Sequence, residues 1–246
     1  MSDRHTLRHG WVRVWDLPTR LFHWTLVLLL ILLWVSGEIG GLGLSYQGEV
    51  LGMPVNLLLG NMDIHMLLGQ AVLALVLFRL IWGVVGSSTA RFAGFVRGPR
   101  SLMAYVAAVA RGEVPATTGH NPAGAVVILA MLTLLLVQGG LGLFANDDIF
   151  SEGPLAARVG KATSDALTVW HGQVFTVLLA VVALHVAAAL YYLARGKNLI
   201  RPMVTGRKPA DTVPPGDPEP RLASPWLALP VLAVAVAIVW AVVTKV

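Results

Sequence analysis

The sequence contains no cysteine, and only 13% of its 246 residues are charged. Without cysteine, the chain forms no disulfide, zinc–thiolate site, iron–sulfur cluster or covalent c-type haem of its own. A soluble domain usually carries about 25% charged residues, so the low charge indicates that lipid surrounds much of the protein. Hydrophobic residues make up 56% of the chain, and we therefore expect a membrane protein.

Five continuous apolar segments are long enough to cross a bilayer core of about 30 Å, which takes about 20 helical residues. They cover approximately residues 21–39, 64–86, 122–145, 169–194 and 225–243. Membrane-spanning strands would instead alternate in hydrophobicity. The first segment resembles a signal peptide, but no small-residue cleavage site follows Ser36-Gly37-Glu38, so we expect a retained helix. The predicted fold is an all-α polytopic bundle, with a four-helix core and a fifth C-terminal helix.

The basic residues of the loops predict the membrane orientation. On one side the loops carry Arg4, Arg8, Arg13, Arg20, Arg91, Arg97, Arg100, Arg111, Arg195, Lys197, Arg201, Arg207, Lys208 and Arg221. The loops of the other side carry only Arg158 and Lys161, with Lys245 at the C-terminus. Basic loops usually stay in the cytoplasm. We therefore expect a multi-pass protein of the bacterial inner membrane, with a cytoplasmic N-terminus and a periplasmic C-terminus.

The four-helix core is expected to occupy residues 1–205 as one domain. Residues 206–224 form a Pro-rich cytoplasmic linker, and residues 225–246 form the C-terminal transmembrane helix. This last helix has no histidine and few polar residues, so we expect a peripheral helix or a contact with a partner subunit. The eight tryptophans lie near predicted helix ends, where interfacial anchors are common.

The loops on the predicted periplasmic side are acidic. They contain Glu38, Glu49, Asp63, Asp147, Asp148, Glu152 and Asp165. Two interpretations are open, since loops are commonly polar, whereas a patch of one sign can also steer a basic soluble partner. The chain offers no reason to expect a nucleic-acid partner.

Four of the seven histidines fall within the predicted spans or at their edges: His23, His65, His171 and His185. Ionisable residues inside a span are rare and usually functional. A single such histidine could simply be a hydrogen-bonded packing residue, but four together favour a shared function. The other three, His5, His9 and His120, are expected to be surface residues of cytoplasmic loops.

Depth in the membrane groups the four histidines into two pairs. His171 and His185 are 14 residues apart on one helix, which separates them by about 21 Å and returns them to within about 40° of one face. His23 then matches the depth of His185, and His65 matches the depth of His171. Each pair joins two helices, as a haem with two axial imidazoles requires. We therefore predict two b-type haems with these histidines as iron ligands. A metal-transport site would gather its ligands at one depth, usually with carboxylates, and purely structural histidines are the remaining alternative.

Two arginines are candidates for contacts with the cofactor. Arg20 lies one turn before His23 and could pair with a haem propionate, or it could simply belong to the basic flank. Arg79 lies 14 residues after His65 and would reach the cytoplasmic haem or a quinone headgroup beside it. Alternatively, the side chain of Arg79 snorkels to the nearby membrane surface.

The segment Val14-Trp15-Asp16-Leu17-Pro18-Thr19-Arg20-Leu21-Phe22-His23-Trp24 resembles the opening of the prokaryotic cytochrome b561 family. That family includes the b-type cytochrome subunits of membrane nickel–iron hydrogenases. The histidine spacing is similar to that of its haem ligands, and the resemblance covers about residues 12–205. It implies quinone-linked electron transfer. The segments Asn146-Asp147-Asp148-Ile149 and Glu152-Gly153-Pro154-Leu155 resemble the branch thought to serve periplasmic c-type cytochromes. The fifth helix departs from the four-helix members.

The function expected from these features is electron relay between the quinone pool and a periplasmic redox partner, with a c-type cytochrome as the favoured partner. The implied cofactors are two haem b groups and a quinone, and quinone oxidoreductase activity is left open. Alternatives within the class are the membrane anchor of a nickel–iron hydrogenase and a superoxide/quinone oxidoreductase. A haem-free metal transporter or a structural anchor represents a different class. A homodimer is compatible with the sequence.

Overall fold

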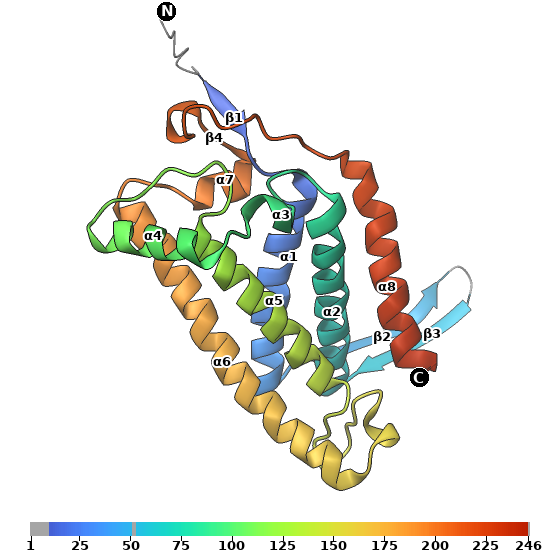
Figure 1. The fold of residues 1–246 in the computed structure, drawn as a ribbon. Helices are drawn as coiled ribbons and strands as arrows, with labels where there is room; N and C mark the ends of the chain where they lie inside the picture. The colour runs from blue at the N-terminus through green and yellow to red at the C-terminus, as the bar shows by residue number, and fades with distance from the viewer. Residues whose placement is uncertain (1–9, 51–52, 246) are drawn as a thin grey trace, which may run out of the picture.

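The computed structural model describes residues 10–50 and 53–245 (Figure 1). Within them, five helices are long and apolar enough to cross a membrane. These helices are α1 (Leu17–Trp34), α2 (Asn61–Val85), α5 (Pro122–Gly142), α6 (Lys161–Ala194) and α8 (Ala228–Lys245). A π-helical turn, Val35–Ile39, extends α1, and a 3₁₀ turn, Pro225–Leu227, precedes α8. The predicted helical membrane bundle is confirmed.

Local capping explains where the helices begin. Asp16 caps α1, because its side chain accepts a hydrogen bond from the backbone N–H of Thr19 at 2.7 Å. Helix α6 begins at Lys161, eight residues before the start predicted from hydrophobicity. Its first two turns are polar, and Asn146 donates to Ser164 Oγ at 2.7 Å. The length of an apolar run in the sequence cannot show a polar helix start that is supported by contacts with a loop.

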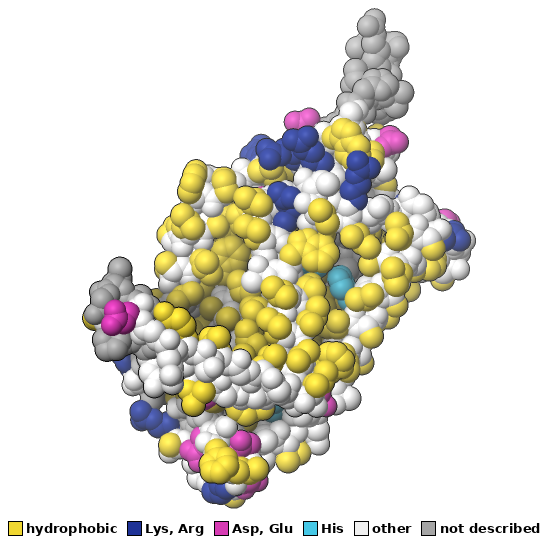
Figure 2. Space-filling view, turned by 180° about the vertical axis from the view of Figure 1, so that it is seen from behind, with side chains coloured by type: hydrophobic (Ala, Val, Ile, Leu, Met, Phe, Trp, Pro, Cys, Tyr) yellow, Lys and Arg dark blue, Asp and Glu magenta, His cyan; other side chains and the backbone are white. Residues whose placement is uncertain are grey.

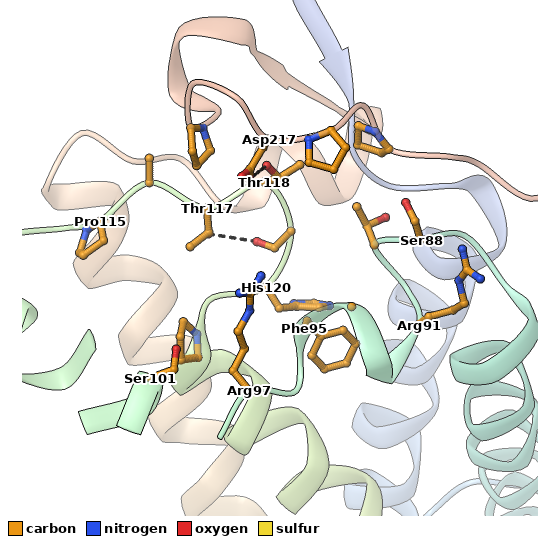
Figure 3. A pocket seen from close by; sticks show the side chains of 18 of the residues that line it. Ser88, Arg91, Phe95, Arg97, Ser101, Pro115, Thr117, Thr118, His120 and Asp217 are labelled. Atoms are coloured by element: carbon orange, nitrogen blue, oxygen red, sulfur yellow. Dashed lines mark hydrogen bonds between the residues drawn. The ribbon is translucent and has the colours of Figure 1, made fainter. Parts of the chain in front are cut away.

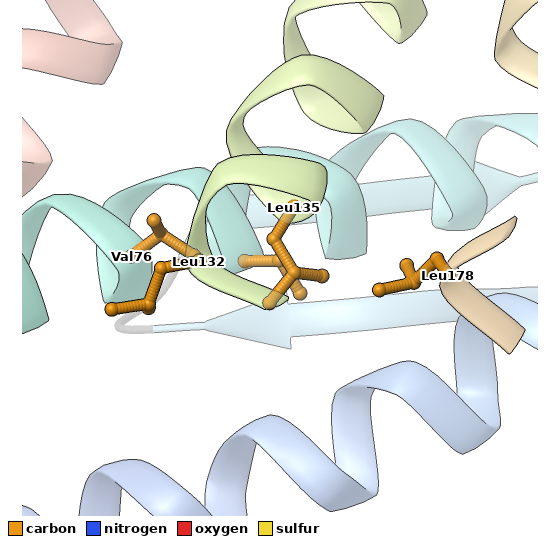
Figure 4. Packing of buried hydrophobic residues seen from close by; sticks show 5 residues of the cluster. Val76, Leu132, Leu135 and Leu178 are labelled. Atoms are coloured by element: carbon orange, nitrogen blue, oxygen red, sulfur yellow. The ribbon is translucent and has the colours of Figure 1, made fainter. Parts of the chain in front are cut away.

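Helix α2 is the centre of the bundle (Figure 1). It packs against α1, α5 and α8, and α5 in turn packs along α6. Leucine and valine side chains from α2, α5 and α6 form the main core cluster, which consists of Val72, Val76, Leu132, Leu135 and Leu178 (Figure 4). Lipid tails are as apolar as these side chains, so close packing holds such helices together, with little contribution from the hydrophobic effect.

The C-terminal segment is folded onto the rest of the chain. Ala235 and Val231 of α8 are buried against Phe78 and Trp82 of α2. The linker before α8 is held by hydrogen bonds, including those from Ser88 N–H to the carbonyl of Arg221 at 2.9 Å and from Ala223 N–H to Ser87 Oγ at 2.8 Å. The described part of the linker is therefore attached to the core along its length.

Short elements cover the two ends of the bundle, and all lie outside the spans. One end, here called the basic side, has β1 (Trp11–Arg13) paired antiparallel with β4 (Arg207–Pro209), together with α3 (Phe92–Phe95), α4 (Pro99–Ala110), α7 (Ile200–Thr205) and the 3₁₀ turn Ala210–Thr212. The other end, the acidic side, has the hairpin of β2 (Leu44–Val50) and β3 (Met53–Leu59) and the 3₁₀ turn Ala156–Arg158. Figure 2 shows Lys and Arg gathered at the basic side and a broad hydrophobic surface between the two ends.

The interpretation of the tryptophans as interfacial anchors is wrong for Trp82. Its side chain is fully buried, and its Nε1–H donates a hydrogen bond to Asp16 Oδ2 at 3.1 Å. Trp15 is also buried, whereas Trp24, Trp170 and Trp240 are exposed, as anchors would be. Trp82 thus helps to fix the start of α1 against α2.

Candidate functional site

The four histidines of the spans form two pairs. His23 of α1 faces His185 of α6, and His65 of α2 faces His171 of α6. The ring centroids are 6.4 Å apart in each pair, with interplanar angles of 54° and 73° respectively. All four side chains are half-buried. The structure thus brings together the same partners that depth in the membrane grouped.

The separation within each pair leaves room for one metal ion. A bond from an imidazole nitrogen to a metal is about 2.0 Å long. Two such bonds, together with the distance from each nitrogen to its ring centre, are compatible with centroids 6.4 Å apart. No group of three or more His, Cys, Asp or Glu in the described part of the chain is placed to hold a metal ion. Two imidazoles suit haem, because the porphyrin supplies the other ligands of the iron.

The backbone of α6 stays apart from the two helices that carry the partner histidines. Among the described residues, α6 packs along α5, and its backbone does not pack closely against α1 or α2. The histidine side chains therefore bridge to α1 and α2 from a helix that is held by α5. A bundle-core cofactor site needs this kind of spacing between facing helices.

On the acidic side, neighbouring groups hold both histidine rings. Ser36 Oγ lies 2.8 Å from Nδ1 of His65, and Nδ1 of His171 donates to the carbonyl of Gln138 at 3.0 Å. Because that carbonyl can only accept, Nδ1 of His171 carries the proton and Nε2 keeps its lone pair. The amide of Gln138 lies 3.1 Å from this Nε2. Nε2 is therefore the ring nitrogen whose lone pair could bind a metal, and in this structure the Gln138 amide donates a hydrogen bond to it.

Two glycines lie against the same rings. A Cβ at Gly142 would lie 3.0 Å from Cε1 of His171, and one at Gly37 would lie 3.2 Å from Cε1 of His65. Few side-chain carbons approach a neighbour this closely, so any larger residue would displace the ring. Gly140, two residues before Gly142 on α5, has no neighbour within 4 Å of its ideal Cβ. Close approach is not confined to the histidines, since a Cβ at Gly139 of α5 would lie 2.5 Å from Cδ2 of Leu73.

On the basic side, several buried polar atoms have no hydrogen-bond partner among the described residues. They are Thr19 Oγ1, Arg20 Nε, His23 Nδ1 and Arg79 Nη1, and on the acidic side Gln138 Oε1 is also buried without a partner. Buried polar atoms are normally paired, so each of these atoms indicates a missing partner. Arg20 also donates through Nη1 to the carbonyl of Val204 at 2.6 Å. The residues present therefore fit a bound group that carries acceptors for the two guanidinium groups.

Arg79 is buried inside the bundle, with only 3% of its surface exposed. Its Nη2 donates to the carbonyl of Ala90 at 3.0 Å, and its guanidinium lies 5.0 Å from the ring centre of Phe92. The alternative in which Arg79 snorkels to the surface is therefore wrong. A buried guanidinium is costly unless its donors are satisfied, which favours an anionic partner for the free Nη1.

His120 is not the surface residue that its place in a loop predicts. It is half-buried between Trp15 and Phe95, at centroid distances of 4.5 and 4.8 Å. Burial, with the nearby charges of Arg79 and the His185–His23 pair, lowers the pKa of His120 to about 3. Only tertiary contacts produce this environment, and no local sequence signal reveals it. His5 and His9 lie outside the described residues.

His120 borders a cavity of about 760 Å³ on the basic side (Figure 3). Arg91, Arg97, Ser101 and Thr118 also line it, and Asp217 is hydrogen-bonded to Thr118 there. The walls come from α3, α4, the loop before α5 and the linker before α8. The cavity is thus built from segments that are far apart in the sequence.

On the acidic side, much of the loop charge is engaged within the loop. Asp147 Oδ1 accepts backbone hydrogen bonds from Ile149, Phe150 and Ser151, and hydrogen bonding from Ser151 and Ile149 lowers the pKa of Asp147 to about 2. Asp148 and Asp165 both form ion pairs with Lys161. The turn leaves the side chain of Phe150 95% exposed. The acidic loop is therefore an ordered feature rather than a string of free carboxylates.

A family model described as prokaryotic cytochrome b561 matches residues 14–206. The chain belongs to the prokaryotic cytochrome b561 family. Its members bind haem b. The chain is accordingly a multi-pass membrane cytochrome that transfers electrons. The match includes both histidine pairs, Arg20 and Arg79, and it ends before α8. No curated protein and no solved structure matches the chain.

Proposed function

We propose that the protein carries electrons across the bacterial inner membrane through two haem b groups, from the quinone pool on one side to a redox partner on the other. His23 and His185 would hold the iron of one haem at the basic side, and His65 and His171 would hold the iron of the other at the acidic side. The observation that carries this proposal is the equal 6.4 Å separation of two histidine pairs. Because α6 supplies one ligand to each pair, the two sites are about 21 Å apart along one helix.

The residues around the pairs have distinct roles in this proposal. The histidines would bind the iron and fix the orientation of the cofactor. Arg79 Nη1 and Arg20 Nε, which are buried without a partner among the described residues, would hold the propionates at the basic side. When bound, haem supplies reversible one-electron chemistry, and the protein groups position it and set its potential.

We further propose that the cavity beside His120 receives the quinone headgroup. Its volume of about 760 Å³ is within the usual range for small-molecule sites. Arg97 and Ser101 provide hydrogen-bond donors near His120, as Figure 3 shows. His120 packs against Trp15, which directly precedes the helix of His23, and this contact supports a position on the side of the basic-side ligands.

We also propose an orientation of the protein in the membrane. The basic side faces the cytoplasm because its loops are rich in arginine, and the acidic side faces the periplasm. A basic soluble protein, such as a c-type cytochrome, would dock near the Asp147–Glu152 turn. The exposed Phe150 and the ionised Asp147 at this turn support a surface that combines apolar contact with charge steering.

Spectroscopy of the purified full-length protein tests the function. We expect a Soret band, a reduced α-band and reduction of the bound haem by a short-chain ubiquinol or menaquinol. His120→Ala should slow quinol reduction several-fold while the haem content stays at the wild-type level. Absence of a Soret band would contradict the cytochrome function. Haem that dithionite reduces but quinols do not would contradict the link to quinone.

A further inference from the structure

The end of α1 differs from the ends of the other spans, because its last turn, Val35–Ile39, is π-helical. Such turns are rare and often occur at functional sites. Here the turn places Ser36, which is only 1% exposed, with its Oγ 2.8 Å from Nδ1 of His65. The next residue is Gly37, whose lack of a side chain allows the His65 ring to approach.

Helix α2 contacts Ser36 through two residues one turn apart. Asn61 Nδ2 donates to the backbone carbonyl of Ser36 at 2.7 Å, and His65 contacts the hydroxyl. Residues four apart lie on the same face of a helix, so Asn61 and His65 face the π-helical turn together. Asn61 Oδ1 also accepts from the backbone N–H of Leu42 at 3.2 Å. The position of Ser36 is therefore fixed through its backbone carbonyl and through its hydroxyl.

The single proton of the hydroxyl determines which tautomer His65 adopts. Ser36 Oγ lies 3.1 Å from the carbonyl of Leu33, which can only accept, so the hydroxyl donates there. Toward His65 the hydroxyl must then act as an acceptor, and Nδ1 of His65 must donate. Nε2 of His65 is left without a proton and keeps its lone pair for a metal.

We propose that Ser36 is a positioning residue that locks His65 in this tautomer and lowers the midpoint potential of the acidic-side haem. This inference rests on the proposed role of His65 as an axial ligand. A histidine ligand becomes more basic when the N–H of its other ring nitrogen donates a hydrogen bond to a neighbouring acceptor. A more basic ligand stabilises the oxidised iron, and hydrogen bonding around the ligands is a known means of tuning haem potential.

The basic-side pair provides an internal reference. Nδ1 of His23 is buried and has no hydrogen-bond partner in the described part of the chain. Removal of the Ser36 hydroxyl should therefore change one of two haem potentials and leave the other in place. Ser87 is a matched control residue, since it is also 1% exposed and lies at the basic side, where its hydroxyl accepts from Ala223 N–H at 2.8 Å.

The test is a spectroelectrochemical titration of the full-length protein with both haem potentials resolved. Ser36→Ala should make the acidic-side haem about tenfold easier to reduce, which corresponds to about +59 mV for one electron. Ser36→Thr and Ser36→Val form a second pair with equal shape and branching, and only the valine variant should shift the potential. Ser87→Ala should shift neither potential.

The possible outcomes separate this inference from the proposed function. Unchanged potentials in both Ser36→Ala and Ser36→Val, with His65→Ala lacking one haem, would overturn the role of Ser36 alone. An equal shift in Ser87→Ala would also overturn it, because the effect would then be general. Retention of both haems by His65→Ala would instead overturn the ligand assignment on which the inference rests.

Discussion

The two histidine pairs have the same ring separation but different surroundings. On the acidic side, Ser36 and the Gln138 carbonyl contact Nδ1 of the two rings, and glycines lie against both. On the basic side, His23 Nδ1 and the side chains of Arg20 and Arg79 have buried atoms without partners among the described residues. One helix, α6, supplies a ring to each pair, whereas the differences arise from what α1, α2 and α5 place beside each ring.

This contrast indicates that the two sites are prepared for their cofactor in different ways. The acidic-side rings are held by hydrogen bonds within the protein, and the Gln138 amide at Nε2 of His171 must move aside before that nitrogen can bind a metal. The basic-side site has donors that need acceptors, so much of its order would come from the bound group. The comparison predicts that substitutions near each pair affect only the haem on their own side.

The largest effect is expected from the glycine beside His171. Gly142→Val should remove one of the two proposed haems, because a Cβ would lie 3.0 Å from Cε1 of a ring that is held at Nδ1. Haem content by pyridine haemochrome measures this loss. Gly140→Val is the matched control on the same helix, since its Cβ would meet nothing within 4 Å. Equal haem content in the two variants would show that the close approach has no role in the acidic-side site.

A smaller effect is expected from the buried arginine on the basic side. Arg79→Gln removes a charged donor, and hydrogen bonds to charged groups contribute about 1.5–3 kcal/mol. We expect haem retention at the basic side to weaken about tenfold or more, while the acidic-side spectrum stays unchanged. Competition with apomyoglobin measures the loss. Arg100→Gln, at an exposed position on α4, is the control. A loss from the acidic side instead would contradict the placement of Arg79.

The smallest effect concerns partner docking at the acidic loop. Asp148→Asn removes one charge together with its ion pair to Lys161 and leaves the three backbone hydrogen bonds to Asp147 in place. We expect electron transfer to a basic c-type cytochrome to slow about twofold at low salt. The difference should vanish near 0.5 M salt, because screening then acts over a few ångströms. Asp211→Asn, exposed on the basic side, should have no effect at either salt concentration. A salt-independent change would argue against docking at this loop.

The spans and the grouping of the histidines were accessible from the sequence. Apolar length alone predicts five helices, and the 14-residue spacing of His171 and His185 places them on one face at two depths. The reason is that these properties depend on one helix at a time. The early start of α6 at Lys161 was missed because its first turns are polar and are supported by Asn146, a residue of the preceding loop.

The surroundings of the pairs were not predictable in the same way. Ser36 and His65 are 29 residues apart, and a π-helical turn brings them together. The burial of Trp82 depends on Asp16, which is 66 residues away in the chain. His120 looks like any loop histidine until Trp15 and Phe95 are placed against it. Each of these contacts depends on how separate helices meet, which periodicity does not encode.

The most direct test of the central claim is the ratio of haem to protein in three purified proteins: the wild type, His185→Ala and His171→Ala. We predict a ratio near two for the wild type and near one for each variant. The haem that remains in His185→Ala should be the one whose potential responds to Ser36. A ratio of one in the wild type, or an unchanged ratio in either variant, would contradict the assignment of one haem to each histidine pair.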